Sequence, residues 1–117
     1  MAAVVIKKTT GLTGLAVHRN PHHVLTVLYN KILRSLGKIP QDAPYRCNTE
    51  QIVKERFQHV KTELDPVKLE QKIGCGQLEE VIKQAENELL LSRQMAHWKP
   101  WEPLLKEAPK NQWKWPI

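Results

Sequence analysis

The sequence predicts an all-α protein: a small three-helix bundle with a short extra helical segment and an extended C-terminal tail rich in proline and tryptophan. Three stretches carry apolar residues at spacings of three and four, the period of an amphipathic helix, and none alternates convincingly with the period of two expected of a half-buried strand. All four tryptophans and four of the eight prolines lie in the last twenty residues. We therefore divide the chain into a basic segment at 1–20, a helical bundle at 21–97 and a tail at 98–117.

The length and hydropathy of the chain limit what it can contain. A chain of 117 residues suits one domain with one small core, and leaves no room for separate cofactor and substrate domains. The longest aliphatic runs are three residues, whereas a membrane-spanning helix needs about twenty. We expect no direct membrane span.

The N-terminal segment accounts for the positive charge of the chain. Residues 1–41 contain six Lys or Arg and no acidic residue, which equals the net charge of +6 of the whole chain. A basic, acid-free and hydroxyl-bearing N-terminus is typical of mitochondrial targeting segments. We interpret 1–20 as an import signal, whether cleaved or retained, with Leu12, Leu15 and Val17 packing against another surface. A flexible arm without a role is the alternative.

The first helix of the bundle has clear signals at both ends. Asn20 suits the N-cap and Pro21 the first helical position, while Gly37 suits the C-terminal stop. One apolar stripe is predicted to face the core, with Tyr29 at the edge of that core. The stripe consists of Val24, Leu25, Leu28, Ile32 and Leu36.

The second helix is predicted to begin near Tyr45, or a few residues later with Asn48 or Thr49 as its cap. Its predicted apolar stripe is Ile52, Val53, Phe57, Val60 and Leu64. Asp65 and Pro66 end this helix and cap a short helical piece that reaches Ile73. The glycines on either side of Cys75 stop that piece.

The third long helix is predicted from about Gln77 to His97. Its apolar stripe is Leu78, Val81, Ile82, Ala85, Leu89, Ser92 and Ala96. Four acidic residues lie opposite or beside this stripe: Glu79, Glu80, Glu86 and Glu88. We expect them to form a solvated face, or alternatively a face that docks to a basic partner surface.

The tail is predicted to be extended chain with turns, because each proline fixes φ and removes a backbone donor. A buried tryptophan removes about 150 to 250 Å² from water, but ordering twenty residues offsets that gain. The tail therefore needs a surface to lie on, either its own bundle as a strap or another subunit. The predicted partner-binding residues are Trp98, Trp101, Leu104, Trp113, Trp115, Pro116 and Ile117.

The residues typical of catalysis do not form a recognisable site in the sequence. Cys47 and Cys75 suggest two reduced thiols in a reducing compartment. Cys75 has an open backbone between glycines, and only Lys72 is a nearby cation that would lower its pKa. His18 and His22 have zinc-like spacing, but Asn20 and Pro21 break the helix between them and no third ligand follows. We expect no catalytic residue, no metal and no cofactor.

Several motifs together carry a resemblance that spans essentially the whole chain. They are Lys7-Lys-Thr-Thr-Gly-Leu-x-Gly-Leu-Ala-Val17, Tyr45-Arg46 with Thr49-Glu-Gln-Ile52, Gly76-Gln-Leu-Glu-Glu-Val-Ile82, Trp101-Glu-Pro-Leu104 and Gln112-Trp-Lys-Trp-Pro-Ile117. The chain resembles the alpha subcomplex subunit 5 family of mitochondrial NADH:ubiquinone oxidoreductase, respiratory complex I. The C-terminal hexapeptide is the most specific of these motifs.

The resemblance implies a non-catalytic accessory subunit on the matrix-side peripheral arm of complex I. A protein of this family is expected to carry no flavin, iron–sulfur cluster or quinone site. It is expected to be part of a hetero-oligomer and to attach to the 30-kilodalton-type core subunit. It is also expected to be a peripheral protein of the mitochondrial inner membrane. Its expected role is assembly or stability of the complex.

Two other function classes remain open at this stage. The basic N-terminus and the tryptophans are compatible with a small mitochondrial helical nucleic-acid-binding protein, which would bind with strong salt dependence. Such a face would more often spread Lys and Arg along one helix or groove. A thiol or metal enzyme is the second class, and metal analysis together with a Cys75→Ser variant would test it.

Overall fold

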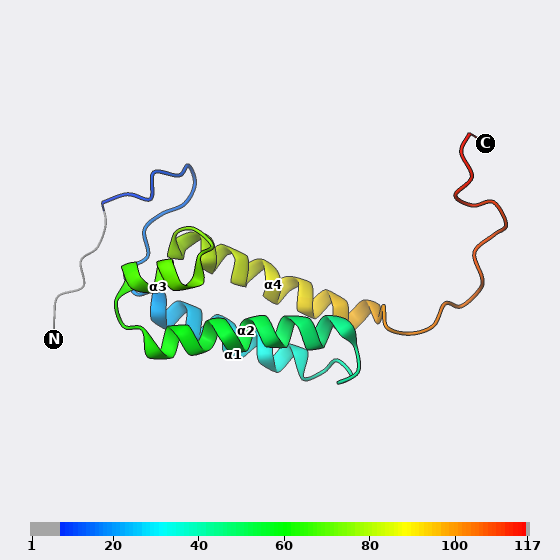
Figure 1. The fold of residues 1–117 in the computed structure, drawn as a ribbon, viewed down its shortest axis with the longest axis horizontal. Helices are drawn as coiled ribbons and strands as arrows, with labels where there is room; N and C mark the ends of the chain where they lie inside the picture. The colour runs from blue at the N-terminus through cyan, green and yellow to red at the C-terminus, as the bar shows by residue number, and fades with distance from the viewer. Residues whose placement is uncertain (1–7, 117) are drawn as a thin grey trace.

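The computed structural model describes residues 8–116, and the regular secondary structure of this part of the chain is entirely helical (Figure 1). The helices are α1 (Pro21–Leu36), α2 (Pro44–Thr62), α3 (Pro66–Ile73) and α4 (Leu78–Trp98). The prediction of an all-α fold with three long helices, a short extra one and an extended tail is confirmed.

Helix α1 lies at the centre of the arrangement and packs against both α2 and α4. Helix α2 runs in the direction opposite to α1 and α4, and the short α3 contacts both of its sequence neighbours (Figure 1). The N-terminal arm and the C-terminal tail leave the bundle at opposite ends (Figure 1). With both long partners packed on α1, a groove is left between α2 and α4.

The ends of α1 are those that the sequence predicts. The Asn20 side chain accepts a hydrogen bond from the His23 N–H at 3.3 Å, and Pro21 takes the first helical position, where a missing N–H costs nothing. The Gly37 N–H donates to the Leu33 carbonyl and closes the last turn.

The buried face of α1 includes a tyrosine that was expected at the edge of the core. Leu25 and Ile32 are fully buried, and Leu36 is nearly so. Tyr29 is only 2% exposed, because its ring lies between α2 and α4 and packs on Phe57 at 6.1 Å between ring centroids. The prediction of an edge position for Tyr29 is therefore wrong.

Helix α2 begins at Pro44, slightly before the predicted start. The preceding Ala43 has ψ 124°, the extended conformation that a following proline favours, and it makes no side-chain cap. Thr49, one of the predicted caps, instead lies buried inside the helix. The proline thus sets the start without a capping side chain.

The predicted apolar stripe of α2 is correct in part. Val53, Phe57 and Val60 are buried in the core. Ile52 is 50% exposed because it faces the rim of the groove, and Leu64 is 83% exposed because the helix has already ended at Thr62. Both residues were predicted to be buried, and both predictions are wrong.

Helix α3 and the start of α4 are held by side chains that cap helix ends. The Asp65 carboxylate accepts from the Val67 N–H at 3.1 Å, as predicted for the cap of the short helix. At the start of α4, the Leu78 N–H donates to Glu70 Oε1 and the Gln77 N–H to Glu80 Oε2. Two acidic residues therefore satisfy N-terminal donors of α4.

The buried face of α4 follows the predicted stripe up to its last turn. Leu78, Val81, Ile82, Ala85, Leu89 and Ser92 are buried. The Ser92 hydroxyl donates to the Ser35 hydroxyl of α1 at 3.0 Å, so this buried polar pair is satisfied between the two helices. Ala96 is only half-buried, because α1 has ended by that level.

The described part of the N-terminal arm contacts the beginning of α4. The Gln77 side-chain amide donates to the Thr10 carbonyl at 2.6 Å, and the His18 N–H donates to Glu79 Oε1 at 3.4 Å. Leu15 and Val17 are half-buried as expected. Leu12 remains 42% exposed. The predicted import signal also includes residues 1–7, which lie outside the described part.

Candidate docking surfaces

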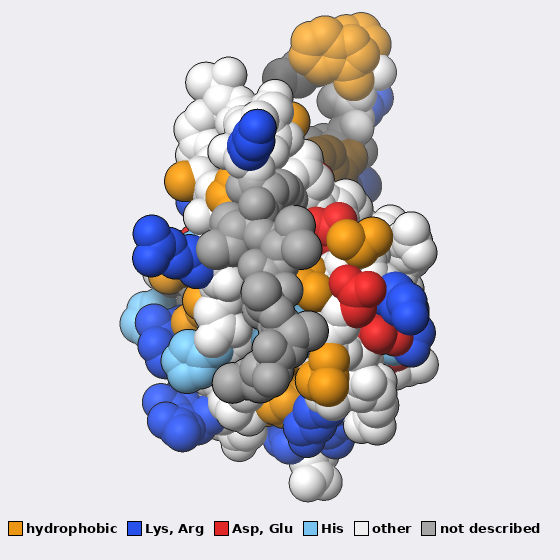
Figure 2. All heavy atoms as spheres, turned by 90° about the vertical axis from the view of Figure 1, so that its left-hand side faces the viewer, with side chains coloured by type: hydrophobic (Ala, Val, Ile, Leu, Met, Phe, Trp, Pro, Cys, Tyr) orange, Lys and Arg blue, Asp and Glu red, His pale blue; other side chains and the backbone are white. Residues whose placement is uncertain are grey.

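The C-terminal tail leaves the bundle as an extended chain with turns, as the prolines predict (Figure 1). Its predicted contact residues are largely open to solvent: the exposed fraction is 61% for Trp98, 82% for Leu104, 90% for Trp113 and 85% for Trp115. Pro116 is also exposed, and Ile117 lies outside the described residues. Figure 2 shows hydrophobic side chains at the free end of the tail, clear of the bundle, at the top of the view.

Trp101 differs from the other tryptophans because it packs against the bundle core. The Glu102 N–H donates to the Lys99 carbonyl and turns the chain at this point. A hollow of about 410 Å³ lies beside Trp101, next to the loop that leads into α2. Both predicted uses of the tail thus have a structural counterpart, an internal strap at Trp101 and an open surface beyond it.

Burial of the exposed indoles by a partner would contribute to the free energy of binding. Burying one tryptophan removes about 150 to 250 Å² from water, and this contributes roughly 4 to 6 kcal/mol at about 25 cal/mol/Å². The bundle supplies no such cover for Trp113 or Trp115 in the described structure. A partner surface that encloses them would gain that contribution, less the cost of ordering the tail.

A second surface is the groove between α2 and α4, which has a volume of about 410 Å³. Its lining combines apolar and polar side chains from all three long helices: Tyr29, Ile32, Thr49, Ile52, Val53, Arg56, Gln84, Ala85, Asn87, Glu88 and Leu91. This groove was not predictable from the sequence. Its existence depends on the distance between α2 and α4 where both pack on α1, and a local sequence pattern does not indicate that distance.

The groove is lined by a buried tyrosine hydroxyl whose proton has no acceptor. The Tyr29 hydroxyl donates to no group among the described residues. Burial raises the pKa of Tyr29, and the positive charge of Arg56 together with the contact of its guanidinium with the hydroxyl opposes that rise in pKa. A buried donor without an acceptor costs about 1 to 3 kcal/mol. The isolated fold therefore leaves this donor unsatisfied.

Arg56 connects the groove to the loop before α4. Its guanidinium donates to Gln84 Oε1 at 3.2 Å and to Cys75 Sγ at 3.1 Å. Neither acceptor is a carboxylate, and no carboxylate pairs with Arg56 in residues 8–116. Spacing along the sequence indicated only Lys72 as a cation near Cys75, because Arg56 and Cys75 are 19 residues apart and are brought together by tertiary packing.

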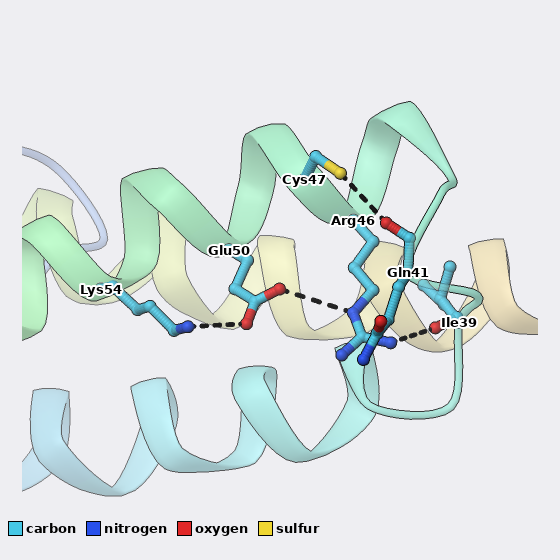
Figure 3. A network of polar contacts seen from close by, with 6 residues as sticks. All are labelled: Ile39, Gln41, Arg46, Cys47, Glu50 and Lys54. Atoms are coloured by element: carbon cyan, nitrogen blue, oxygen red, sulfur yellow. Dashed lines mark hydrogen bonds and ion pairs between the residues drawn. The ribbon is translucent and has the colours of Figure 1, made fainter.

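Arg46, one of two half-buried arginines of α2, shows the more usual arrangement (Figure 3). Its Nε donates to Glu50 Oε2 at 3.5 Å and its Nη1 donates to the Ile39 carbonyl at 2.5 Å. Lys54 pairs with the other oxygen of Glu50 at 2.8 Å, and these cations lower the pKa of that carboxyl, Lys54 most strongly. Arg46 thus has an anionic partner, which Arg56 lacks.

The four acidic residues of α4 do not form the shared solvated or docking face that the sequence suggested. Glu79 is buried, and Glu80 caps the start of its own helix. Glu88 accepts a hydrogen bond from the Tyr45 hydroxyl at 2.5 Å. Of these four, only Glu86 is exposed to solvent as predicted, and its carboxylate Oε2 lies 3.9 Å from Lys83 Nζ. The other three carboxylates have structural roles.

The residues considered for thiol or metal chemistry lie apart from one another. Within residues 8–116, no group of three or more His, Cys, Asp or Glu side chains could hold a metal ion. Cys47 is exposed and its thiol donates to the Gln41 carbonyl at 3.2 Å, as drawn in Figure 3. His22 instead bonds the Glu63 carbonyl at 2.8 Å. No helix in this part of the chain is long and apolar enough to cross a membrane.

The basic side chains on the end of the bundle that bears the N-terminal arm stand in separate groups. Figure 2 shows Lys and Arg at the left, lower and right edges of this face, and carboxylates adjoin the group at the right. Histidines lie among the basic side chains at the left, and hydrophobic side chains lie between the left and right edges (Figure 2). The described basic side chains seen in this view are thus spread around the edges of the face, whereas nucleic-acid-binding faces commonly gather them along one helix or groove.

Several known proteins similar to this chain are named as the same subunit of one enzyme complex. Residues 14–80 match a family model described as "ETC complex I subunit conserved region". A Bos taurus protein named NADH dehydrogenase (ubiquinone) 1 alpha subcomplex subunit 5 is 59% identical, over 98% of this chain and 99% of its own length. The Rattus norvegicus protein of that name is 57% identical over the same shares. An Arabidopsis thaliana relative, whose name adds "mitochondrial", is 41% identical over 82% of this chain and 57% of its own length.

Proposed function

This chain belongs to the alpha subcomplex subunit 5 family of mitochondrial respiratory complex I, and from that premise we propose that it supports the assembly and stability of the complex without catalysing electron transfer. The observation that carries the proposal is the exposed end of the tail. Trp113 and Trp115 are 90% and 85% exposed on a segment that the bundle does not cover. A subunit held in a larger assembly would bury them in its neighbour.

The proposal includes a place and a partner. We infer that the protein lies on the matrix side of the inner membrane, as a peripheral component of the arm that carries electrons from NADH toward ubiquinone. Its partners are other complex I subunits, above all the 30-kilodalton-type core subunit, in a hetero-oligomer. The contact residues are the tail side chains Trp98, Trp101, Leu104, Trp113, Trp115, Pro116 and Ile117. Trp101 is half-buried against the bundle core and lies where the chain passes from the bundle into the outer tail.

Replacing both outer indoles tests this function. A tagged wild-type chain is expected to co-migrate with complex I on a native gel. Trp113→Ala with Trp115→Ala is expected to lower the co-migrating fraction about tenfold or more, because buried tryptophans are frequent hot spots of interfaces. Helical circular dichroism of the isolated variant should stay unchanged, since both side chains lie outside the bundle.

A matched control and two contrary results make this test decisive. Leu64→Ala removes an apolar side chain of similar exposure at the other end of the bundle, and should leave co-migration unchanged. If the wild-type chain runs only as a free monomer, it is not a complex I component under those conditions and the proposed function fails. If the double tryptophan variant melts the helices, the tail is an internal strap.

The proposed partner and location have tests of their own. A photoreactive residue in place of Trp113, in the assembled complex, should cross-link to the 30-kilodalton-type core subunit. In intact inner-membrane vesicles with the matrix face outside, added protease should reach the chain, and carbonate should extract it. Cross-linking to a different subunit would correct the partner, and resistance to carbonate would argue against peripheral attachment.

A further inference from the structure

The groove between α2 and α4 has features of an incomplete binding site, separate from the tail. Two hydrogen-bond donors meet in its deep part, the Tyr29 hydroxyl and the Arg56 guanidinium. The hydroxyl donates to no acceptor in the described structure, and Arg56 donates to Gln84 and Cys75 but pairs with no carboxylate there. Arg and a phenol together offer several N–H and O–H donors, which an oxygen anion could accept.

Two exposed apolar side chains lie on the rim of the groove. Ile52 of α2 is 50% exposed and Leu91 of α4 is 41% exposed, and both line the groove. Trp98 lies two helical turns after Leu91 and is 61% exposed, so the open face of α4 continues to the root of the tail. An occupant of the groove would therefore be a neighbour of whatever the tail contacts.

We propose that this groove binds a segment of a neighbouring complex I subunit that carries an aspartate or glutamate next to an apolar side chain. The partner's carboxylate accepts hydrogen bonds from Arg56 and the Tyr29 hydroxyl, and its apolar side chain lies between Ile52 and Leu91. The inference rests on the proposed function for the identity of the assembly. It uses a surface on the bundle, whereas the proposed function uses the tail.

The charges around the groove favour an acidic occupant at the Arg56 end. Arginine can form two parallel hydrogen bonds with a carboxylate. Arg46 on the same helix already has an anionic partner, Glu50, whereas Arg56 has none in the described structure. Glu88 also lines the groove, but its carboxylate accepts from the Tyr45 hydroxyl. The partner's carboxylate therefore belongs against Arg56, and the exposed Ile52 and Leu91 favour an apolar side chain next to it.

A zero-length cross-link in the assembled complex tests the proposed carboxylate directly. Arg56→Lys places an amine at the same position, and a carbodiimide joins an amine to a carboxylate only where the two are in contact. We expect an amide bond between position 56 and an Asp or Glu of another subunit, identified by peptide sequencing. The Lys54–Glu50 pair, 2.8 Å apart, is the internal control, because it should link within the chain in the same sample.

Tyr29→Phe separates a docking role from a structural role. Removing an unpaired hydroxyl should leave the isolated full-length chain as stable as wild type or more stable, measured as its midpoint of urea unfolding. The same variant should be displaced from complex I more easily by competing wild-type chain. Arg56→Gln should weaken retention about tenfold or more, since it leaves the partner's charge unpaired.

The rim is tested by adding a charge. Ile52→Glu should also lower retention, because it puts a carboxylate beside the incoming one. Val67→Glu is the control: Val67 is an exposed apolar residue of α3, 60% exposed, and does not line the groove. Equal loss with both variants would overturn the assignment of the groove.

Three results would contradict the proposed groove site without contradicting the proposed docking of the tail. The first is an Arg56→Lys chain that co-migrates with complex I and shows the Lys54–Glu50 link but no link from position 56. The second is a link from position 56 to a second copy of this chain or to its own tail. The third is a Tyr29→Phe variant that is less stable in isolation and is retained in the complex as well as wild type. Failure of the wild-type chain to co-migrate at all would instead refute the proposed function.

Discussion

Gly76 shows how a single residue fixes the start of the longest helix. Its φ is +89°, a region that L side chains rarely adopt, and the Glu80 carboxylate occupies the space where a Cβ would stand. That carboxylate accepts from the Gln77 N–H at 2.8 Å. The glycine therefore serves two purposes, the sharp turn before α4 and room for the side chain that caps it.

Gly76→Ala is expected to lower the free energy of unfolding by about 2 to 3 kcal/mol. The left-handed conformation costs about 1 to 2 kcal/mol for a residue with a Cβ, and displacing the cap costs about 1 kcal/mol more. Gly74 has φ +70°, and the nearest atom to a Cβ added there would be 3.9 Å away. Gly74→Ala therefore carries the conformational cost alone and should lose about 1 to 2 kcal/mol. Urea unfolding of both variants checks the difference, and equal losses would rule out the role of Glu80.

At the scale of elements, a side-chain hydrogen bond crosses from α2 to α4 beside the groove. The Tyr45 hydroxyl donates to Glu88 Oε1 at 2.5 Å. Burial raises the pKa of Tyr45 well above its ordinary value, and the bond to the Glu88 carboxylate raises it further. The two helices meet mainly through α1, so this bond is one of the few direct ties between them.

The raised pKa of Tyr45 predicts a loss of stability at high pH. Above about pH 10 the unfolded chain releases the phenolic proton while the folded chain keeps it. The unfolded state then binds fewer protons, so the free energy of unfolding falls as pH rises. Tyr45→Phe should remove this contribution, and should cost about 1 kcal/mol at neutral pH.

Urea unfolding between about pH 9 and 11 measures that slope. The wild-type decline should be steeper than that of Tyr45→Phe, and a small decline should remain because Tyr29 also has a raised pKa. Glu88→Gln keeps an acceptor without the charge, so it should weaken the pH dependence less than Tyr45→Phe does. Identical slopes for all three proteins would contradict a coupled Tyr45–Glu88 pair.

The elements also show which features a sequence can predict. The ends of α1 and α3 follow from Asn20, Gly37 and Asp65, because caps act within a few residues along the chain. The burial of Tyr29 and the bond from Arg56 to Cys75 depend on where whole helices pack, so local periodicity does not reveal them. The tail was predictable as extended chain, since proline acts locally, but its anchoring at Trp101 was not.

At the scale of the whole molecule, the bundle and the outer tail are energetically separate. The overall dimensions of 64 × 35 × 20 Å include a tail that reaches far from the core (Figure 1). Residues 102–116 are exposed throughout, whereas Trp101 packs on the core. Folding of the bundle should therefore depend on the chain up to this tryptophan, and assembly on the chain beyond it.

Removing residues 103–117 should leave thermal unfolding of the isolated protein unchanged, because none of the described side chains in that range is buried. Trp101→Ala in the full chain should instead lower the free energy of unfolding by about 2 kcal/mol, less than the 3 to 5 kcal/mol typical of a fully buried tryptophan, and the unfolding temperature by about 5 to 10 °C. Calorimetry of the two variants measures this contrast, and native gels should show the reverse order, with the truncated chain lost from complex I. A truncation that lowers the unfolding temperature as much as Trp101→Ala would mean that the outer tail stabilises the bundle. That result would contradict separate roles for the bundle in folding and for the outer tail in docking.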